Sequence, residues 1–314
     1  MSKSKLAVIA LCSILVVSSQ QAEAAQKKSS TSSTLNTQLK YLDQTISSIK
    51  DQVLASNYDS VTVHIDPQLV NSGWAADATS NLTTALKLMN YFGYSSSSPL
   101  NVYLSLGPDY KNKFIPTSCQ YNSGGGSCGN GIMFGDIKWF TDMWGWNDQS
   151  KSTYPDESTK LDWSANLPHE IGHVLQESSG NGTGSQGRNL QPAWLREGAA
   201  EFFKLATYSI QNNVSYSSLR TPHLKYWRYC KGVKVSSLTS QGSYPSSCEY
   251  TVGLVAFELL IIKEKSLKPL YLYQQTPGST QSEIFKNAFG FSQDSFQREA
   301  DKYFVTSTAN VPSN

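Results

Sequence analysis

The sequence predicts an α+β fold with two lobes, an N-terminal α/β lobe over residues 35–160 and a mainly helical lobe over residues 161–314. Three observations lead to this prediction. Helical and strand patterns alternate in the first half of the chain. A glycine-rich stretch then leads into a short apolar segment, typical of an edge strand in a small mixed sheet. From Leu161 onward almost every apolar pattern has helical spacing.

The chain begins with the pattern of a secretory signal peptide. Lys3 and Lys5 precede an apolar stretch over 6–17, and Ala22-Glu23-Ala24 is a small-residue cleavage pattern. The apolar stretch is too short to span a bilayer. We therefore expect a signal peptide over 1–24, a disordered polar leader over 25–34, and a secreted or periplasmic protein with no integral membrane segment after cleavage.

Four segments of regular structure are expected in the first lobe. Residues 35–55 have apolar residues at three- and four-residue spacing and predict an amphipathic helix. Alternation at Val61, Val63 and Ile65 predicts a strand. Residues 75–91 predict a second helix, and residues 100–106 a second strand.

The segment after this is less regular. Residues 119–131 are rich in glycine, and Ile132-Met133-Phe134 is a short apolar stretch that we predict to be the edge strand beside the functional site. Residues 137–147 contain Trp139, Trp144 and Trp146. We expect these rings to pack in the core and between the lobes. The alternative is that they form an aromatic wall that contacts substrate.

Four cysteines remain after the leader is removed, because Cys12 lies in the signal peptide. An even number in an oxidising compartment indicates two disulfides. Three connectivities are possible, and proximity in sequence favours Cys119 with Cys128 and Cys230 with Cys248. Zinc ligation by these cysteines is less consistent with their spacing.

The charge balance gives no indication of a polyanionic partner. The whole chain has 26 basic and 24 acidic residues, and without Lys3, Lys5 and Glu23 the balance is 24 against 23. A nucleic-acid partner is therefore not expected. The sequence does not indicate an oligomeric state.

His169-Glu170-Ile171-Gly172-His173 is the most informative motif of the chain. On a helix, residues four apart lie on one face, so both imidazoles point the same way with a carboxylate beside them. That arrangement predicts two ligands of a zinc ion and a general base. Pro168 indicates that the helix begins close to this point.

A third ligand is needed, because a catalytic zinc ion has three protein ligands and one open position. Residues 178–188 contain four glycines and allow the chain to reverse into a second predicted helix over 192–202, which contains Glu197. We predict His169, His173 and Glu197 as the ligands of one zinc ion. Gln176 and Ser179 stand where a metzincin has glycine and histidine, which excludes that group.

Three segments resemble the gluzincin metallopeptidases, peptidase MA-like enzymes related to thermolysin and to the membrane alanyl aminopeptidases. They are LPHEIGHVLQ at 167–176, PAWLREGAAEFF at 192–203 and EYTVG at 249–253. The resemblance covers roughly 160–305. It implies a zincin-like fold and a zinc peptidase, and it maps the ligand glutamate of W-L-x-E-G onto Glu197.

The resemblance also implies roles for three further residues. Glu201 corresponds to an acidic residue that hydrogen-bonds a ligand histidine and fixes its tautomer; the alternative is a surface carboxylate. Tyr250 corresponds to the aminopeptidase tyrosine that stabilises the oxyanion. His223 competes with Tyr250 for that role, because thermolysin-like enzymes use a histidine.

The expected activity is hydrolysis of a peptide or protein substrate, with Glu170 as general base. Aminopeptidases of this group have a Gly-x-Met-Glu-Asn strand, whereas residues 131–135 read Gly-Ile-Met-Phe-Gly. The missing glutamate favours an endopeptidase. Two alternatives remain open: an inactive zincin-like binding protein, and a zinc hydrolase of a non-peptide substrate.

Overall fold

A computed structural model describes residues 34–309 and residue 311, apart from 59, 95–98, 118–119, 121–124, 128–131, 138–156, 179–189, 225–228 and 240–247. The chain divides into two compact units, Met1–Tyr41 and Leu42–Asn314, and the description below concerns the second. The predicted signal peptide and nearly all of the predicted leader lie outside the described residues. So does most of the tryptophan-rich segment.

The α+β class is confirmed, and the sheet is small and mixed. Its four strands are β1 (Val61–Ile65), β2 (Leu100–Ser105), β3 (Gly125–Ser127) and β4 (Ile132–Asp136), in the order β1-β2-β4-β3. β1 pairs in parallel with β2 and β2 with β4, whereas β3 is antiparallel to β4. The two strands predicted around Val63 and over 100–106 are thus confirmed.

The predicted edge strand is wrong in one respect. Residues 132–134 do form a strand, but β4 has a neighbour on each side and the edge on this side of the sheet is β3. Because β3 is Gly-Gly-Ser, it has no hydrophobic alternation by which the sequence could reveal it. A Cβ atom at Gly125 would lie 1.7 Å from Nδ2 of Asn166, so a larger residue there would have to displace the Asn166 side chain.

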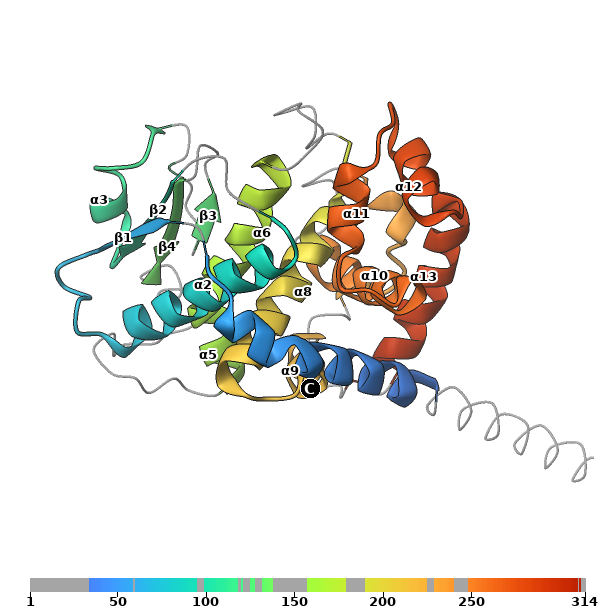
Figure 1. Cartoon of the computed structure of the whole chain (residues 1–314), viewed down its shortest axis with the longest axis horizontal. Helices are drawn as coiled ribbons and strands as arrows, with labels where there is room; N and C mark the ends of the chain where they lie inside the picture. Colours follow the sequence, from blue (N-terminus) through green and yellow to red (C-terminus); the bar gives the residue numbers. More distant parts are fainter. Residues whose placement is uncertain are drawn as a thin grey trace, which may run out of the picture. The chain divides into compact units, whose positions relative to one another are not determined.

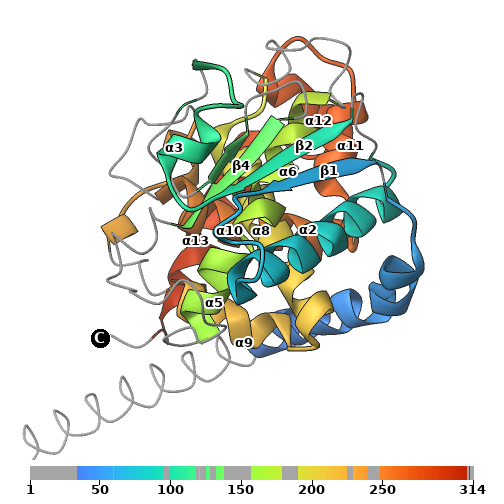
Figure 2. The same ribbon diagram turned by 90° about the vertical axis from the view of Figure 1, so that its left-hand side faces the viewer.

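The long helices lie along one face of the sheet and extend away from it (Figures 1 and 2). Residues 34–55 form a helix, which confirms the one predicted over 35–55, and its part from Leu42 onward belongs to the second unit. The others are α2 (Gly73–Tyr91), α3 (Pro108–Lys111), α5 (Glu157–Ser164), α6 (Asn166–Ser178), α8 (Ala193–Asn212), α9 (Tyr216–His223), α10 (Cys248–Glu264), α11 (Pro269–Gln275), α12 (Gln281–Phe289) and α13 (Gln293–Thr308), with a short 3₁₀ helix, η3, at Val235–Ser237.

α8 is the central helix of this unit. α6 contacts β3 and β4 on one side and α8 on the other, and α8 in turn contacts α10, which packs against α13. Every residue of α8 from Ala193 to Ile210 is buried, as expected for a helix surrounded on all sides by protein. The mainly helical second half is therefore built in layers around one buried helix.

α8 and α10 approach closely because each has a glycine at the crossing. A Cβ atom on Gly198 would lie 2.1 Å from the backbone oxygen of Gly253, and one on Gly253 would lie 2.6 Å from the backbone oxygen of Trp194. Neither position has space for a methyl group. The glycines thus allow the two backbones to come into contact directly beside Glu197.

A buried ion pair joins α9 to α10. Nε of Arg220 donates to both carboxylate oxygens of Glu258 at 2.7 and 2.9 Å, and the Tyr216 hydroxyl donates to Oε1 at 2.7 Å. Glu258 is fully buried. Buried charges are tolerated when they are paired and hydrogen-bonded, and this carboxylate accepts from two side chains.

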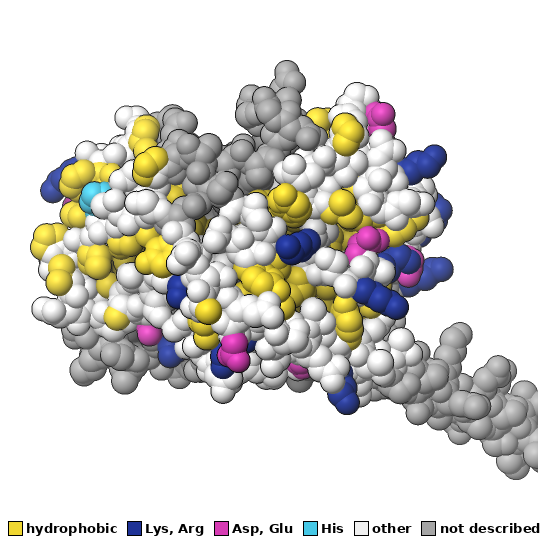
Figure 3. All heavy atoms as spheres, viewed as in Figure 1, with side chains coloured by type: hydrophobic (Ala, Val, Ile, Leu, Met, Phe, Trp, Pro, Cys, Tyr) yellow, Lys and Arg dark blue, Asp and Glu magenta, His cyan; other side chains and the backbone are white. Residues whose placement is uncertain are grey.

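The surface that Figure 3 shows has no concentration of one charge. Among the described residues on that face, Lys and Arg side chains are interspersed with Asp and Glu. None of the described helices is both long enough and apolar enough to cross a membrane.

Candidate metal centre

The motif helix α6 begins at Asn166, so Pro168 is its third residue, where a proline removes no helical hydrogen bond. α6 lies against α8 at Gly172, since a Cβ atom there would be 3.2 Å from Cα and Cβ of Ala200. This contact sets the two imidazoles of α6 opposite the carboxylates of α8.

His169, His173 and Glu197 converge in the interior. Nε2 of His173 lies 3.1 Å from Oε2 of Glu197, and Nε2 of His169 lies 3.5 Å from the same oxygen. The two Nε2 atoms are 3.0 Å apart. All three residues are buried, and their donor atoms lie within 4.8 Å of one another. The three predicted ligands are thus brought together.

The hydrogen-bond pattern fits a metal ion. Oε2 of Glu197 is buried and no described residue donates a hydrogen bond to it. Nδ1 of His173 faces Oε1 of Gln176 at 3.0 Å, and because an amide oxygen only accepts, the ring proton is on Nδ1 and Nε2 has a free lone pair. Two imidazole nitrogens and one carboxylate oxygen are a donor set that zinc accepts.

Carboxylates control the charge of His169. Its Nδ1 lies 2.8 Å from Oε1 of Glu201. Burial opposes the charged imidazole, but Glu201 and then Glu197 outweigh it and raise the pKa of His169 to about 10. Burial also disfavours an ionised Glu197, yet His173 and His169 hold the pKa of that carboxyl well below its usual value. Without a bound ion, Glu201 and Glu197 thus favour the protonated form of His169.

Glu201 is not the surface carboxylate that the sequence left open as an alternative, because it is 5% exposed. Its second oxygen, Oε2, lies 2.7 Å from Nε2 of His223 and 3.8 Å from Nζ of Lys204. Burial opposes its ionisation, but Lys204 and His223 keep its pKa well below the usual value. Glu201 thus lies between His169 and two cationic groups.

His223 is occupied by carboxylates on both of its ring nitrogens. Nε2 contacts Glu201, and Nδ1 lies 3.8 Å from Oδ1 of Asp162. Lys204 contacts the same Asp162 oxygen at 3.2 Å. Glu201 therefore lies between His169 and His223. This position suits His223 to holding Glu201 in place better than to donating a hydrogen bond to substrate.

Tyr250 lies beside the cluster. Its ring centroid is 5.5 Å from that of His169. Burial, and after it the charge of Glu197, raise the pKa of the phenol far above its ordinary value, so Tyr250 is protonated and available as a hydrogen-bond donor. Glu170 is also buried, and burial raises its pKa despite the two histidines, which suits a proton acceptor that works near neutral pH.

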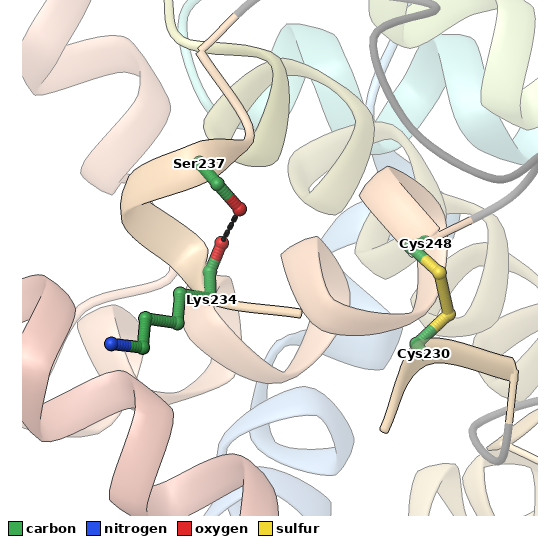
Figure 4. The surroundings of a disulfide bond; sticks show 4 residues. All are labelled: Cys230, Lys234, Ser237 and Cys248. Carbon is green, nitrogen blue, oxygen red and sulfur yellow. Dashed lines mark hydrogen bonds between the residues drawn. A yellow bond between two sulfur atoms is a disulfide. The ribbon is translucent and has the colours of Figure 1, made fainter. Parts of the chain in front are cut away.

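A disulfide fixes the start of the helix that contains Tyr250. Cys230 and Cys248 are bonded, as predicted, with their Cα atoms 5.4 Å apart, and α10 begins at Cys248 (Figure 4). On the other side of the bond, the chain continues into η3, where the Ser237 hydroxyl donates to the backbone oxygen of Lys234. Cys119 and Cys128 lie outside the described residues.

Two residues that contact the predicted ligands were not predicted from the sequence. Gln176 was considered only as a residue that excludes metzincins, although it contacts His173. Arg196 occupied the variable position of W-L-x-E-G, yet Nε and Nη2 of Arg196 both donate to Oε1 of Glu197, at 3.1 and 3.0 Å. The signal available for Gln176 was its position, three residues after His173 on the same helical face.

Protein-family models, curated proteins and solved structures were compared with the chain, and none of them matches. The gluzincin resemblance and its zincin-like arrangement of lobes therefore stay predictions that rest on three motifs. The convergence of His169, His173 and Glu197 shows that these three residues could hold a metal ion.

Proposed function

We propose that this protein is a zinc-dependent metallopeptidase that cleaves internal peptide bonds. The observation that carries the proposal is the convergence of His169, His173 and Glu197 at a buried point where Oε2 of Glu197 receives no hydrogen bond from a described residue. His173 has its outer ring nitrogen occupied by a hydrogen-bond acceptor, which leaves Nε2 free for a metal ion.

One zinc ion, when bound, supplies Lewis acidity, which polarises a carbonyl and acidifies water. Glu170 takes the proton from the attacking water and delivers it to the leaving amine. Its burial supports this role, because a raised pKa allows a carboxylate to accept and then return a proton near neutral pH.

Tyr250 is proposed as the group that stabilises the oxyanion. A neutral phenol beside His169 donates a hydrogen bond where negative charge develops on the former carbonyl oxygen. His223, which was the competing residue, is engaged by Glu201 and Asp162. We therefore assign His223 to the support of Glu201 and the donor role to Tyr250.

The preference for internal bonds rests on β4. An aminopeptidase needs a carboxylate there to hold the free amine of its substrate, and Phe134 of this strand is buried. The acidic residue of the strand, Asp136, is buried and paired with Lys111 at 3.1 Å. Since no residue of β4 offers a free carboxylate, a free amine has no anchor on this strand.

We also propose that the protein works outside the cytoplasm. The cleavage pattern at 22–24 and the Cys230–Cys248 disulfide are both consistent with export into an oxidising compartment.

Mapping of the cleavage sites in a denatured protein mixture by mass spectrometry tests the function, with Glu170→Gln compared with the unmodified chain. The variant should retain stoichiometric zinc and lose turnover by a factor of roughly a hundred or more. Glu299→Gln, an exposed change on α13, is the matched control and should cut normally. Cleavage by Glu170→Gln at the normal rate would contradict the assignment.

The same experiment separates the alternatives. New N-termini within proteins indicate an endopeptidase, and trimming from the ends an exopeptidase. A chain that binds zinc but produces no cuts would point to the binding protein or to a hydrolase of another bond.

A further inference from the structure

Arg196 is a buried cation beside a proposed metal ligand. It is 6% exposed and immediately precedes Glu197 in α8. Its Nε and Nη2 atoms donate to the same oxygen, Oε1 of Glu197, at 3.1 and 3.0 Å. A buried guanidinium requires such an acceptor, because an unpaired charge in the interior is costly.

The two oxygens of Glu197 thereby have different surroundings. Oε1 is engaged by Arg196, whereas Oε2 faces both histidines and receives no hydrogen bond from the described residues. A carboxylate can bind a metal ion through one oxygen or through both. With Oε1 held by two charge-assisted hydrogen bonds, only Oε2 is free to coordinate.

Arg196 also supports the opposite side of the cluster. Its backbone oxygen accepts a hydrogen bond from Nε2 of Gln176 at 2.9 Å, and Oε1 of Gln176 is the acceptor for Nδ1 of His173. Arg196 thus holds Glu197 directly through its side chain, and it holds His173 indirectly through its backbone oxygen and Gln176. These contacts join α6 to α8 next to the proposed ligands.

Electrostatics alone do not explain an arginine at this place. A positive group next to a carboxylate ligand lowers the attraction of that carboxylate for a cation. What the guanidinium contributes is geometry, because its donors fix the plane of the Glu197 carboxylate and block its second oxygen.

We propose that Arg196 is a positioning residue that restricts Glu197 to one coordinating oxygen and so favours zinc over metal ions that need more oxygen ligands. The inference deepens the proposed function and rests on the same metal site. Zinc accepts four ligands in a tetrahedron, whereas manganese and calcium prefer six or more, with more oxygen. Three protein ligands that each bind through one atom match the tetrahedral zinc site and leave its fourth position open.

Metal binding by the metal-stripped full-length chain tests this, with Arg196→Met and Arg196→Lys as variants and Arg298→Met, an exposed change on α13, as control. Cobalt(II) is the spectroscopic probe, since its visible absorption is intense when four-coordinate, weaker when five-coordinate and weakest when six-coordinate. Affinities for zinc and manganese are measured by competition with a chromogenic chelator. Circular dichroism verifies that each variant is folded.

The unmodified chain and Arg298→Met should give the intense cobalt spectrum. Arg196→Met frees Oε1, so the cobalt bands should weaken and the preference for zinc over manganese should fall by about tenfold, in the range expected for residues that orient ligands. Arg196→Lys keeps the charge but has no planar pair of donors, and it should behave like Arg196→Met. If Arg196→Met does not fold, Arg196→Lys provides the same comparison.

Two results overturn the inference in distinguishable ways. An intense cobalt spectrum and an unchanged zinc preference in both Arg196 variants contradict the role of Arg196 alone. An unmodified chain that binds neither cobalt nor zinc contradicts the metal site, and the proposed function with it.

Discussion

Replacing Gly198 with alanine should destabilise the protein, although alanine normally favours a helix. The added Cβ would lie 2.1 Å from the backbone oxygen and 2.3 Å from the backbone carbon of Gly253. Ordinary contact requires more than 3 Å, so α8 and α10 must separate by roughly 1 Å. Both obstructing atoms belong to the main chain and cannot rotate away.

The magnitude follows from two opposing effects. Overpacking a buried contact costs about 1–3 kcal/mol, and the rigid backbone places this case at the upper end. Alanine in place of glycine returns up to about 1 kcal/mol through helix propensity. The net loss of about 2 kcal/mol corresponds to a fall in the melting temperature of about 4–8 °C for a domain of this size.

Thermal unfolding of the metal-free chain, followed by circular dichroism, measures this effect without a contribution from zinc. Gly172→Ala is the matched control, because its Cβ would be 3.2 Å from Ala200, a distance that a shift of a few tenths of an ångström relieves. That variant should melt within about 2 °C of the unmodified chain. A melting temperature for Gly198→Ala at or above the unmodified value would refute the reasoning.

Three further predictions concern charge and metal. Arg220→Met leaves Glu258 buried without its cation and should cost about 3–5 kcal/mol in urea unfolding, and a loss under 1 kcal/mol would contradict the pairing. Burial opposes ionisation of Asp162, but Lys204 lowers its pKa to about 2. A depressed folded-state pKa adds stability that is present above about pH 4 and lost as the pH falls toward 2, so Asp162→Asn should lose less stability over this interval than the unmodified chain. Equal losses would contradict the shift. Removal of zinc with a chelator should lower the melting temperature and zinc should restore it, whereas His173→Ala should respond to neither treatment.

The sequence was sufficient to predict that His169, His173 and Glu197 lie together. The interval of four between His169 and His173 fixes their common face on any helix. Glu197 was indicated by the glycine-rich reversal before its helix and by the resemblance of W-L-x-E-G to the gluzincin motif. α8 extends to Asn212, ten residues beyond the predicted end at residue 202, because the apolar pattern continues until Asn213 adopts a left-handed conformation with φ of 56°.

Contacts between distant segments could not be read from the sequence. Glu201 was expected to support His169, but its contact with His223 depends on where α9 packs against α8. The hydrogen bond from Gln176 to the backbone of Arg196 likewise needs the α6–α8 approach at Gly172. β3 was missed because two glycines and a serine have no strand preference.

The Cys230–Cys248 bond makes one part of the site depend on oxidation and leaves the other independent of it. The disulfide enters α10 two residues before Tyr250, whereas His169, His173 and Glu197 belong to α6 and α8. Cleavage of the bond by a reductant frees the first turn of α10 from its covalent anchor and leaves the ligand helices in their mutual contact. On the proposed assignment, reduction leaves the three metal ligands in place while Tyr250 loses its fixed position, so a reductant is expected to lower turnover more than metal content.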